Sequence, residues 1–158
     1  MVEGLRPMRL EDCRAISLRR EDSLECRATG ARDDTEAVRQ SFLLSTVALA
    51  WAPGGVGPPM AFAGIIDSPT RPRREGQVWL LTADVVRQHP VAFHRLALDF
   101  LWACGWRVLR NHVDASYTAA LRWLRTLGFS VAPAAPWGPW GLPFCAVEWR
   151  RPWTHSPF

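Results

Sequence analysis

Lysine is missing from the 158-residue sequence, so every cation among its 19 Lys and Arg residues is an arginine. The formal net charge is +4, but the arginines are scattered and never form a run of five or more. A nucleic-acid-binding surface needs clustered positive charge. The spacing therefore disfavours a DNA or RNA partner, and codon usage in a GC-rich genome accounts for the choice of arginine.

Metal motifs and long apolar runs are missing as well. The four cysteines form no C-x-x-C pair, which predicts buried reduced thiols and no metal centre; they are Cys13, Cys26, Cys104 and Cys145. No uninterrupted apolar run reaches the roughly 18 residues that a membrane span needs, and no signal-peptide pattern is present. We therefore expect no membrane span and a location in the cytoplasm or inside a virion.

The composition is that of a globular protein. Hydrophobic residues make up 48% and charged residues 22%, far from the make-up of disordered chains. A domain of this length buries roughly two-thirds of the surface that its unfolded chain exposes, which leaves no core for a second domain. We expect one domain over residues 1–151 and a tail over 152–158. The nine tryptophans are many for this length, and some are expected to face another protein.

Local patterns predict an α/β fold. Helical patterns occupy residues 10–18, 22–27, 90–105 and 118–127, and a further helix follows a cap at Asp33. Strand patterns occupy 45–51, 60–66, 78–81, 108–113, 129–131 and 144–149. The strand-helix-strand order predicts parallel pairing at the centre, while the first hairpin and the last pair predict antiparallel edges. Helices should cover both faces of this mixed, twisted sheet.

A longer pattern over residues 111–129 is more specific. Asn111 leads from a strand into a helix that bears alanines and ends in Leu-Gly-Phe. The pattern resembles the last conserved block of the GNAT acetyltransferases. Residues 122–129 resemble the R-W-L-x-x-L-G-F helix of a bacteriophage GNAT-like family, which is itself similar to the internal virion protein A of short-tailed phages. Further matches extend the resemblance over nearly the whole chain, at 5–7, 19–22, 78–81 and 138–144.

This resemblance carries expectations about fold and partners. It implies a GNAT-like fold, with a centrally parallel sheet of about six to seven strands and helices on both faces. It also implies a location in the virion or the host cytoplasm, with other phage structural proteins as partners.

The cofactor-binding segment departs from the GNAT pattern. In GNAT enzymes the pyrophosphate of acetyl-CoA lies on backbone N–H groups of a glycine-containing loop that opens the long helix. The matching segment 82–92 contains no glycine, and Pro90 lacks an N–H. The resemblance also places Tyr117 where the family has a cofactor-contacting Asn, and Leu124 where it has the Tyr that protonates the departing thiolate. Since a leucine cannot donate a proton, the resemblance implies a degenerate site.

If acetyl-CoA binding is retained, the resemblance assigns it to a defined set of residues. Arg87 would contact phosphate directly, although Asp84 places an opposing charge nearby. The assigned residues are Leu81, Thr82, Arg87, Gln88, His89, Ala92, Tyr117 and Ala120.

Three residues are candidates for catalysis. His89 begins the long helix, where the helix N-terminus lowers a histidine pKa and favours a base, or it is a surface side chain beside a cap. Glu25, with Glu21 and Asp22 before it, either binds a cationic amine or solvates a helix face. Tyr117 is the only tyrosine, but it lies too early in its helix to replace the missing acid directly.

The tryptophans of the C-terminal region form a second pattern. Trp137, Trp140, Trp149 and Trp153 lie in and beyond a Pro- and Gly-rich segment. They form either a surface for a partner protein or an aromatic flap folded onto the sheet.

Two hypotheses about function follow. In the first, the chain is a phage-encoded binding protein associated with the virion or its assembly, with little or no catalysis and no cofactor. In the second, it is an active N-acetyltransferase that uses acetyl-CoA through an atypical pyrophosphate loop. The second requires a V-shaped opening between residues 78–81 and 108–113, wide enough for a pantetheine arm.

Overall fold

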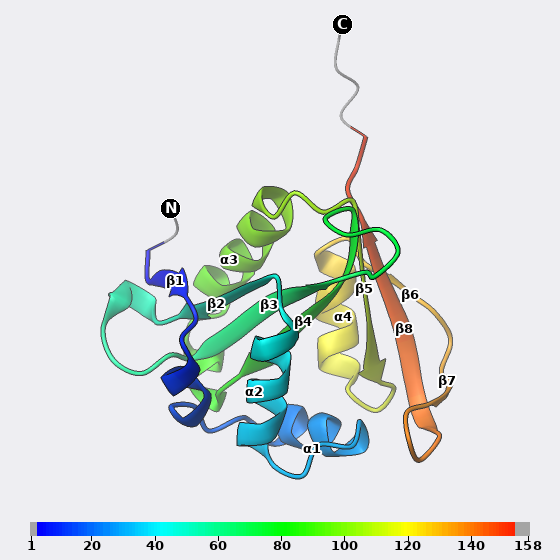
Figure 1. Cartoon of the computed structure of the whole chain (residues 1–158), viewed down its shortest axis with the longest axis horizontal. Coiled ribbons are helices and arrows are strands. Elements are labelled where there is room, and N and C mark those ends of the chain that lie inside the picture. Colours follow the sequence, from blue (N-terminus) through cyan, green and yellow to red (C-terminus); the bar gives the residue numbers. More distant parts are fainter. Residues whose placement is uncertain (1–2, 154–158) are drawn as a thin grey trace, which may run out of the picture.

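One mixed sheet runs through the computed structural model, which describes residues 3–153 (Figure 1). Residues 154–158 of the predicted tail lie outside the described residues. The strands are β1 (Leu5–Pro7), β2 (Val47–Trp51), β3 (Ala61–Asp67), β4 (Glu75–Thr82), β5 (Val108–Asp114), β6 (Ser130–Val131), β7 (Ala135–Trp137) and β8 (Leu142–Arg150). Their order is β1-β2-β3-β4-β5-β8-β6, with β7 paired to β8.

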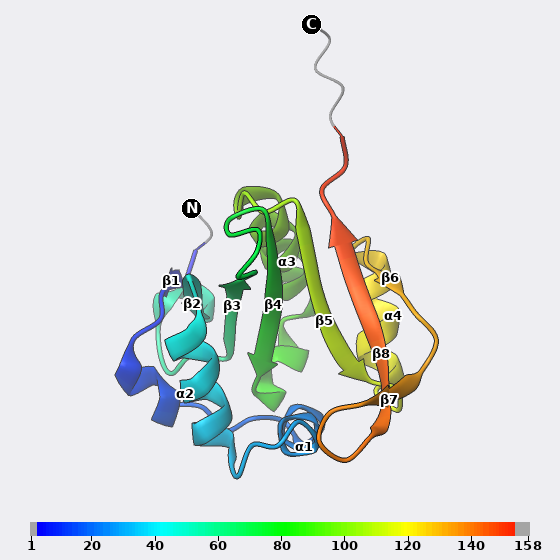
Figure 2. The same cartoon turned by 45° about the vertical axis from the view of Figure 1, so that its right-hand side comes forward.

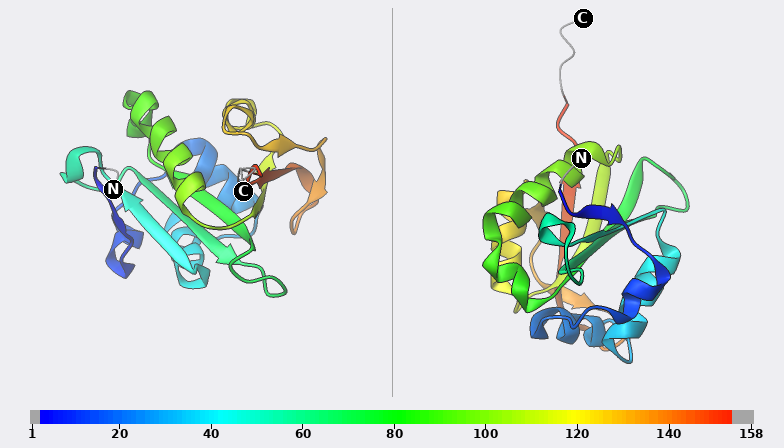
Figure 3. Two further views of the ribbon diagram at one scale, coloured as in Figure 1. Left: turned by 90° about the horizontal axis from the view of Figure 1, so that it is seen from above. Right: turned by 90° about the vertical axis from the view of Figure 1, so that its left-hand side faces the viewer.

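Helices cover both faces of this sheet, as predicted. The α-helices are α1 (Arg20–Ala28), α2 (Asp34–Leu44), α3 (Pro90–Ala103) and α4 (Thr118–Thr126). The 3-10 helices are η1 (Leu10–Arg14), η2 (Pro53–Gly55) and η3 (Asp84–Gln88). Figure 3 shows α3 and α4 on one face of the sheet and α1 and α2 on the other.

Local signals set several element boundaries. The Asp33 carboxylate accepts a 2.8 Å hydrogen bond from the Glu36 N–H, which confirms the predicted cap of α2. Pro90 occupies the first turn of α3, where no intrahelical donor is needed. Gly128 follows α4 with a φ of +94°, a conformation that residues with a side chain rarely adopt.

Three local predictions were wrong. The helix expected over 10–18 is only the short η1, because the Asp12 carboxylate turns back to pair with Arg6 of β1 at 2.7 Å. The apolar residues on most sides of the segment 90–105 predict a well-buried helix, but the outer side of α3 faces solvent and Trp102 is 49% exposed. The Pro- and Gly-rich segment after residue 132 contains a strand, β7, which long-range pairing with β8 imposes.

The two central strands separate after a short stretch of parallel pairing. β4 and β5 pair only through Glu75–Gln77 and Val108–Arg110. At the next step the Asn111 side-chain amide donates a 2.8 Å hydrogen bond to the Val78 carbonyl, which takes the place of a backbone ladder bond. Figure 2 shows the strands diverging from there toward the end of the sheet where α1 lies.

Candidate functional site

A partly open cavity begins between β4 and β5 beyond their point of separation, and it continues beneath α3 toward Leu49 of β2 and Ala63 of β3. Its volume is about 150 Å³. Most of its wall is apolar and includes Val78, Leu80, Phe100, Val113, Ala120 and Leu124. Polar side chains also line it, namely Arg19, Asp22, Glu25, Asn111 and Tyr117.

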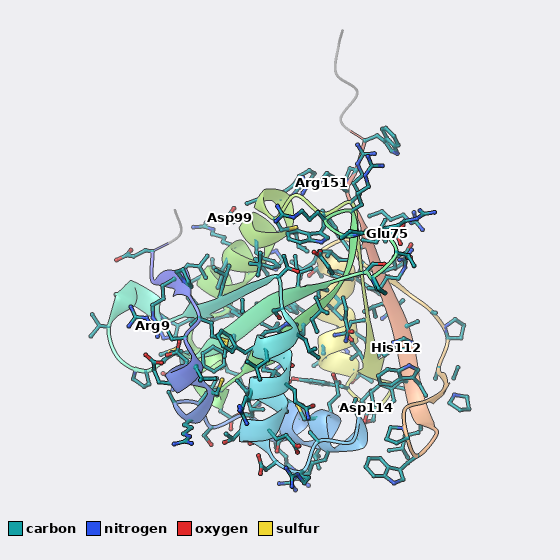
Figure 4. The ribbon with its side chains drawn as sticks, in the orientation of Figure 1. Arg9, Glu75, Asp99, His112, Asp114 and Arg151 are labelled. Atoms are coloured by element: carbon teal, nitrogen blue, oxygen red, sulfur yellow. The ribbon has the colours of Figure 1, made fainter. Side chains whose placement is uncertain are left out.

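Helix α1 holds the separated ends of both strands. The buried Asp22 carboxylate accepts hydrogen bonds from the Thr82 N–H at 2.8 Å and the Thr82 hydroxyl at 2.7 Å, at the end of β4. Glu25, one turn further along α1, accepts a 3.1 Å hydrogen bond from the Asp114 N–H at the end of β5. Figure 4 shows Asp114 at the α1 end of the sheet. Through these two carboxylates, α1 is hydrogen-bonded to the separated ends of both β4 and β5.

The carboxyl groups of Asp22 and Glu25 are both poorly solvated. Burial raises the pKa of Asp22, against the opposing effects of Arg19 and the Thr82 hydrogen bonds. Burial likewise raises the pKa of Glu25 to about 7, helped by the negative charges of Asp22 and Asp114 and opposed by the Asp114 N–H and Arg19. Glu25 therefore exchanges its proton near neutral pH, as a general base must.

Tyr117 presents an unusual hydroxyl to this site. The hydroxyl is buried and has no hydrogen-bond partner among residues 3–153. Burial raises its pKa, and the negative charge of Asp22 adds to the rise. The Arg19 guanidinium lies 5.2 Å from the Tyr117 ring centre, and its Nε lies 3.4 Å from the Asp22 carboxylate. Tyr117 thus remains a neutral donor at physiological pH.

An aromatic pair closes the helix side of the cavity. The rings of Phe93 from α3 and Trp123 from α4 stack with centres 5.3 Å apart and planes 18° from parallel. The Trp123 indole N–H donates to His94 of α3 at 3.2 Å, which fixes the stack further. Cavities that bind ordinary ligands measure roughly 300–1,000 Å³, so the space left here is small.

The start of α3 offers few free donors. Pro90 has no N–H, and the Phe93 N–H is already bonded to the His89 carbonyl. The exposed Arg87 side chain pairs with Glu21 of α1 at 3.0 Å. Its Nε also lies 3.8 Å from the Asp84 carboxylate.

The predicted cofactor residues do not form one cluster. Tyr117 and Ala120 line the cavity, whereas Ala92 faces a separate groove beside α3. Leu81 packs on the opposite face of the sheet with Val38 of α2. The remaining four lie outside the cavity lining: Thr82 beneath Asp22, Arg87 and Gln88 on the surface, and His89 at the N-cap of α3.

Sequence reasoning missed four side chains of the site, which are Arg19, Phe93, Asn111 and Trp123. Only Asn111 gave a signal, since it opens the 111–129 pattern, and nothing in the sequence separates its role from that of its polar neighbours Arg110 and His112. The aromatic pair gave none, because Phe93 and Trp123 each fit the apolar face of an ordinary helix.

The C-terminal tryptophans divide into a buried and an exposed group. Trp137 stacks on His112 with ring centres 4.3 Å apart and planes 8° from parallel, so this part of the segment folds onto the sheet. Trp149 is also buried. Trp140 and Trp153 are exposed by 63% and 86%, and remain available to a partner.

The cysteines behave as packing residues. Cys13 and Cys145 are buried, and burial raises the pKa of Cys26 to about 12, far from thiolate chemistry at neutral pH. Within residues 3–153, no three His, Cys, Asp or Glu side chains gather as a metal site requires. No helix of the described chain is long and apolar enough to cross a membrane.

No family model matches the sequence, and no curated protein matches it. Solved structures do. The chain is similar to yncA, a putative acetyltransferase from Salmonella typhimurium with acetyl-CoA, at a TM-score of 0.63 and 18% identity over 100% of this chain and 99% of that one. It is also similar to a GNAT superfamily phosphinothricin acetyltransferase from Sinorhizobium meliloti in complex with AcCoA, at a TM-score of 0.65 and 15% identity over 99% and 97% of the chains. The chain has the GNAT fold.

A third solved chain gives the same result. The GNAT-family acetyltransferase from Bacillus anthracis superposes with a TM-score of 0.67 at 9% identity, over 95% of this chain and 96% of that one. Identities this low fix the fold and leave the activity to be argued from the site.

Acetyl-CoA is the cofactor that the GNAT fold implies, and three features of this structure lie where it would bind. The pyrophosphate position offers Pro90 in place of a free N–H, and Arg87 is engaged by Glu21. Phe93 and Trp123 stack on each other and both line the cavity, whose whole volume is about 150 Å³.

Proposed function

We propose that this chain is a phage-encoded GNAT-fold protein that binds a protein partner in the virion or during its assembly, and that it transfers acetyl groups slowly or not at all. The observation that carries the non-catalytic half is the Phe93–Trp123 stack across the cavity. A pantetheine arm would have to displace these rings, and aromatic pairs contribute about 0.5–1.5 kcal/mol beyond the area they bury.

The start of α3 also supports the proposal that acetyl transfer is slow or absent. Pyrophosphate binding at a helix N-terminus relies on several free, closely spaced N–H groups. Pro90 removes one of these donors, and Leu124 supplies no proton for a departing thiolate. Both changes remove machinery that an acetyl-CoA-dependent enzyme uses.

Two observations support the binding half. The exposed rings of Trp140 and Trp153 are of the kind that protein interfaces favour. The Arg107 guanidinium lies 5.9 Å from the Trp153 ring centre, within the range of a cation–π contact. The phage assignment itself rests on the resemblance of residues 122–129 to the bacteriophage family.

Calorimetric titration with acetyl-CoA tests the non-catalytic half. We expect no saturable heat up to millimolar ligand, and a micromolar dissociation constant would overturn it. The double variant Phe93→Ala, Trp123→Ala is the matched comparison. If the aromatic pair is the obstacle, the double variant binds acetyl-CoA more tightly than the parent protein.

Mass spectrometry of purified phage particles tests the binding half. We expect this chain to co-purify with virions or with an assembly intermediate through density-gradient centrifugation. The double variant Trp140→Ala, Trp153→Ala should lower its amount in particles without unfolding the domain. Absence of the parent chain from both particles and intermediates would overturn the assembly role.

A second candidate function is an active N-acetyltransferase, and one observation favours it. Glu25 lines an opening between separated strands, and its pKa of about 7 suits removal of a proton from an amine at neutral pH. Acetyl-CoA-dependent acetylation of a primary amine, lost in the Glu25→Gln variant and retained in Glu21→Gln, would establish it.

A further inference from the structure

The Tyr117 hydroxyl is a donor without a use in the proposed function. It is buried, it has no hydrogen-bond partner within the described part of the chain, and Tyr117 lines the cavity. Leaving a buried hydroxyl unpaired costs about 1–3 kcal/mol. A group that occupies the cavity and accepts this hydrogen bond would remove that cost.

A second buried donor lies beside the first. The Arg19 Nε–H also lacks a well-formed hydrogen bond, although it lies 3.4 Å from the Asp22 carboxylate. The guanidinium of Arg19 lies 5.2 Å from the centre of the Tyr117 ring, so the two residues stand together. Both line the same cavity. The two unpaired donors therefore belong to neighbouring side chains of the same cavity wall.

The apolar part of the cavity sets the size of the ligand. Its wall is built from side chains such as Leu80, Phe100 and Leu124. A dry apolar cavity of about 150 Å³ in another protein binds benzene, and the cavity here has the same volume. The space therefore suits a body of one ring or a short branched chain.

The charges around the donors set the class of the head group. The positive charge of Arg19 is balanced by Asp22 at 3.4 Å, so a ligand carboxylate would add a further negative charge beside Asp22 and Glu25. A ligand ammonium would be repelled by the positive charge of Arg19, and it has no lone pair that could accept a hydrogen bond from the Tyr117 hydroxyl. A neutral carbonyl accepts from both donors, and an amide N–H can in addition donate to the Glu25 carboxylate.

We propose that the cavity between β4 and β5 binds a small neutral amide with an apolar body, independently of any coenzyme. The amide oxygen accepts from the Tyr117 hydroxyl and the Arg19 Nε–H, and the apolar body lies against Leu80, Phe100 and Leu124. The proposal goes beyond the proposed function, since it requires neither a protein partner nor acetyl transfer.

The test is an NMR titration of the full chain with four one-ring probes: benzamide, toluene, benzoate and benzylamine. We expect benzamide to bind saturably with a millimolar or lower dissociation constant. Benzoate and benzylamine should bind at least tenfold more weakly than benzamide. No saturable shift with benzamide overturns the proposal, as does tighter binding of either charged probe.

The Tyr117→Phe variant tests the hydrogen bond to the ligand's amide oxygen separately from the packing of its apolar body. It removes one oxygen and keeps the ring. We expect it to weaken benzamide about tenfold, the equivalent of one hydrogen bond of about 1.4 kcal/mol, and to change toluene less than twofold. Equal effects on both probes, or no effect on either, would overturn the role of the hydroxyl.

The location is tested by two substitutions on α4. Ala120→Leu fills the cavity and should abolish benzamide binding, whereas Ala119→Leu, on the exposed neighbouring position, should leave it unchanged. Benzamide binding that survives Ala120→Leu would place the site elsewhere and overturn the proposal. A parallel acetyl-CoA titration keeps the outcomes separate, because coenzyme binding alone contradicts only the proposed function.

Discussion

Glu25 makes the stability of this fold depend on pH. Burial, with the nearby charges of Asp22 and Asp114, holds its pKa at about 7 instead of the ordinary 4.5. A raised pKa means that the fold favours the protonated acid. The contribution of protonated Glu25 to the free energy of unfolding is therefore complete below about pH 4.5, and it is lost as the pH rises to about 7. Since one pKa unit corresponds to about 1.4 kcal/mol, ionisation of Glu25 costs the fold about 3 kcal/mol.

The Glu25→Gln variant isolates this contribution. Its amide oxygen can still accept the Asp114 N–H bond, but the side chain no longer titrates. Urea unfolding at pH values from 4 to 8.5 gives the free energy of unfolding of both proteins. We expect the parent to lose about 2–3 kcal/mol relative to the variant as the pH rises through this range. A difference that stays constant with pH would refute the reasoning.

Glu21→Gln is the matched control on the same helix. Glu21 is exposed by 39% and pairs with Arg87. Its pKa is lowered, first by its own backbone N–H and also by Arg87. Any stability that it contributes is therefore lost as the pH falls through its folded pKa, at the acid end. The control should show no loss of stability between pH 5 and 8.5.

Three further predictions concern stability and are measured by urea and thermal unfolding. Asp22→Ala leaves the buried Thr82 N–H without its acceptor and should cost about 3–5 kcal/mol, whereas Asp84→Ala, at an exposed carboxylate, should cost less than about 0.5 kcal/mol. Gly64→Ala would place a methyl group 2.6 Å from a backbone carbonyl oxygen of β2 and should cost about 1–3 kcal/mol or more. Arg151→Gln removes guanidinium donors to two backbone carbonyls in the last turn of α3 and to the Trp106 carbonyl beyond it, near the position that Figure 4 labels, and should cost about 1–3 kcal/mol. Asp22→Ala or Arg151→Gln within about 0.5 kcal/mol of the parent would contradict the assigned contacts.

The sequence by itself determined most elements and the class of fold. Helix start and stop signals act within a few residues of chain, so they can be recognised from the sequence alone; here they are the Asp33 cap, Pro90 in a first turn and Gly128 after α4. The alternation of strand and helix patterns from residue 78 to residue 131 then predicted the parallel pair at the centre of the sheet. The prediction of helices on both faces of the sheet followed from the same local signals.

Tertiary structure alone decided the make-up of the site. β7 exists because β8 supplies its hydrogen bonds, although proline and glycine surround it. Glu25 and Asp114 are 89 positions apart in the chain, and their contact follows only from the way α1 crosses the ends of two strands. The Phe93–Trp123 stack likewise joins faces of two helices that each look ordinary in sequence. Local patterns fix which face of an element is apolar, but contacts between distant elements fix which atoms meet and which donors stay unpaired.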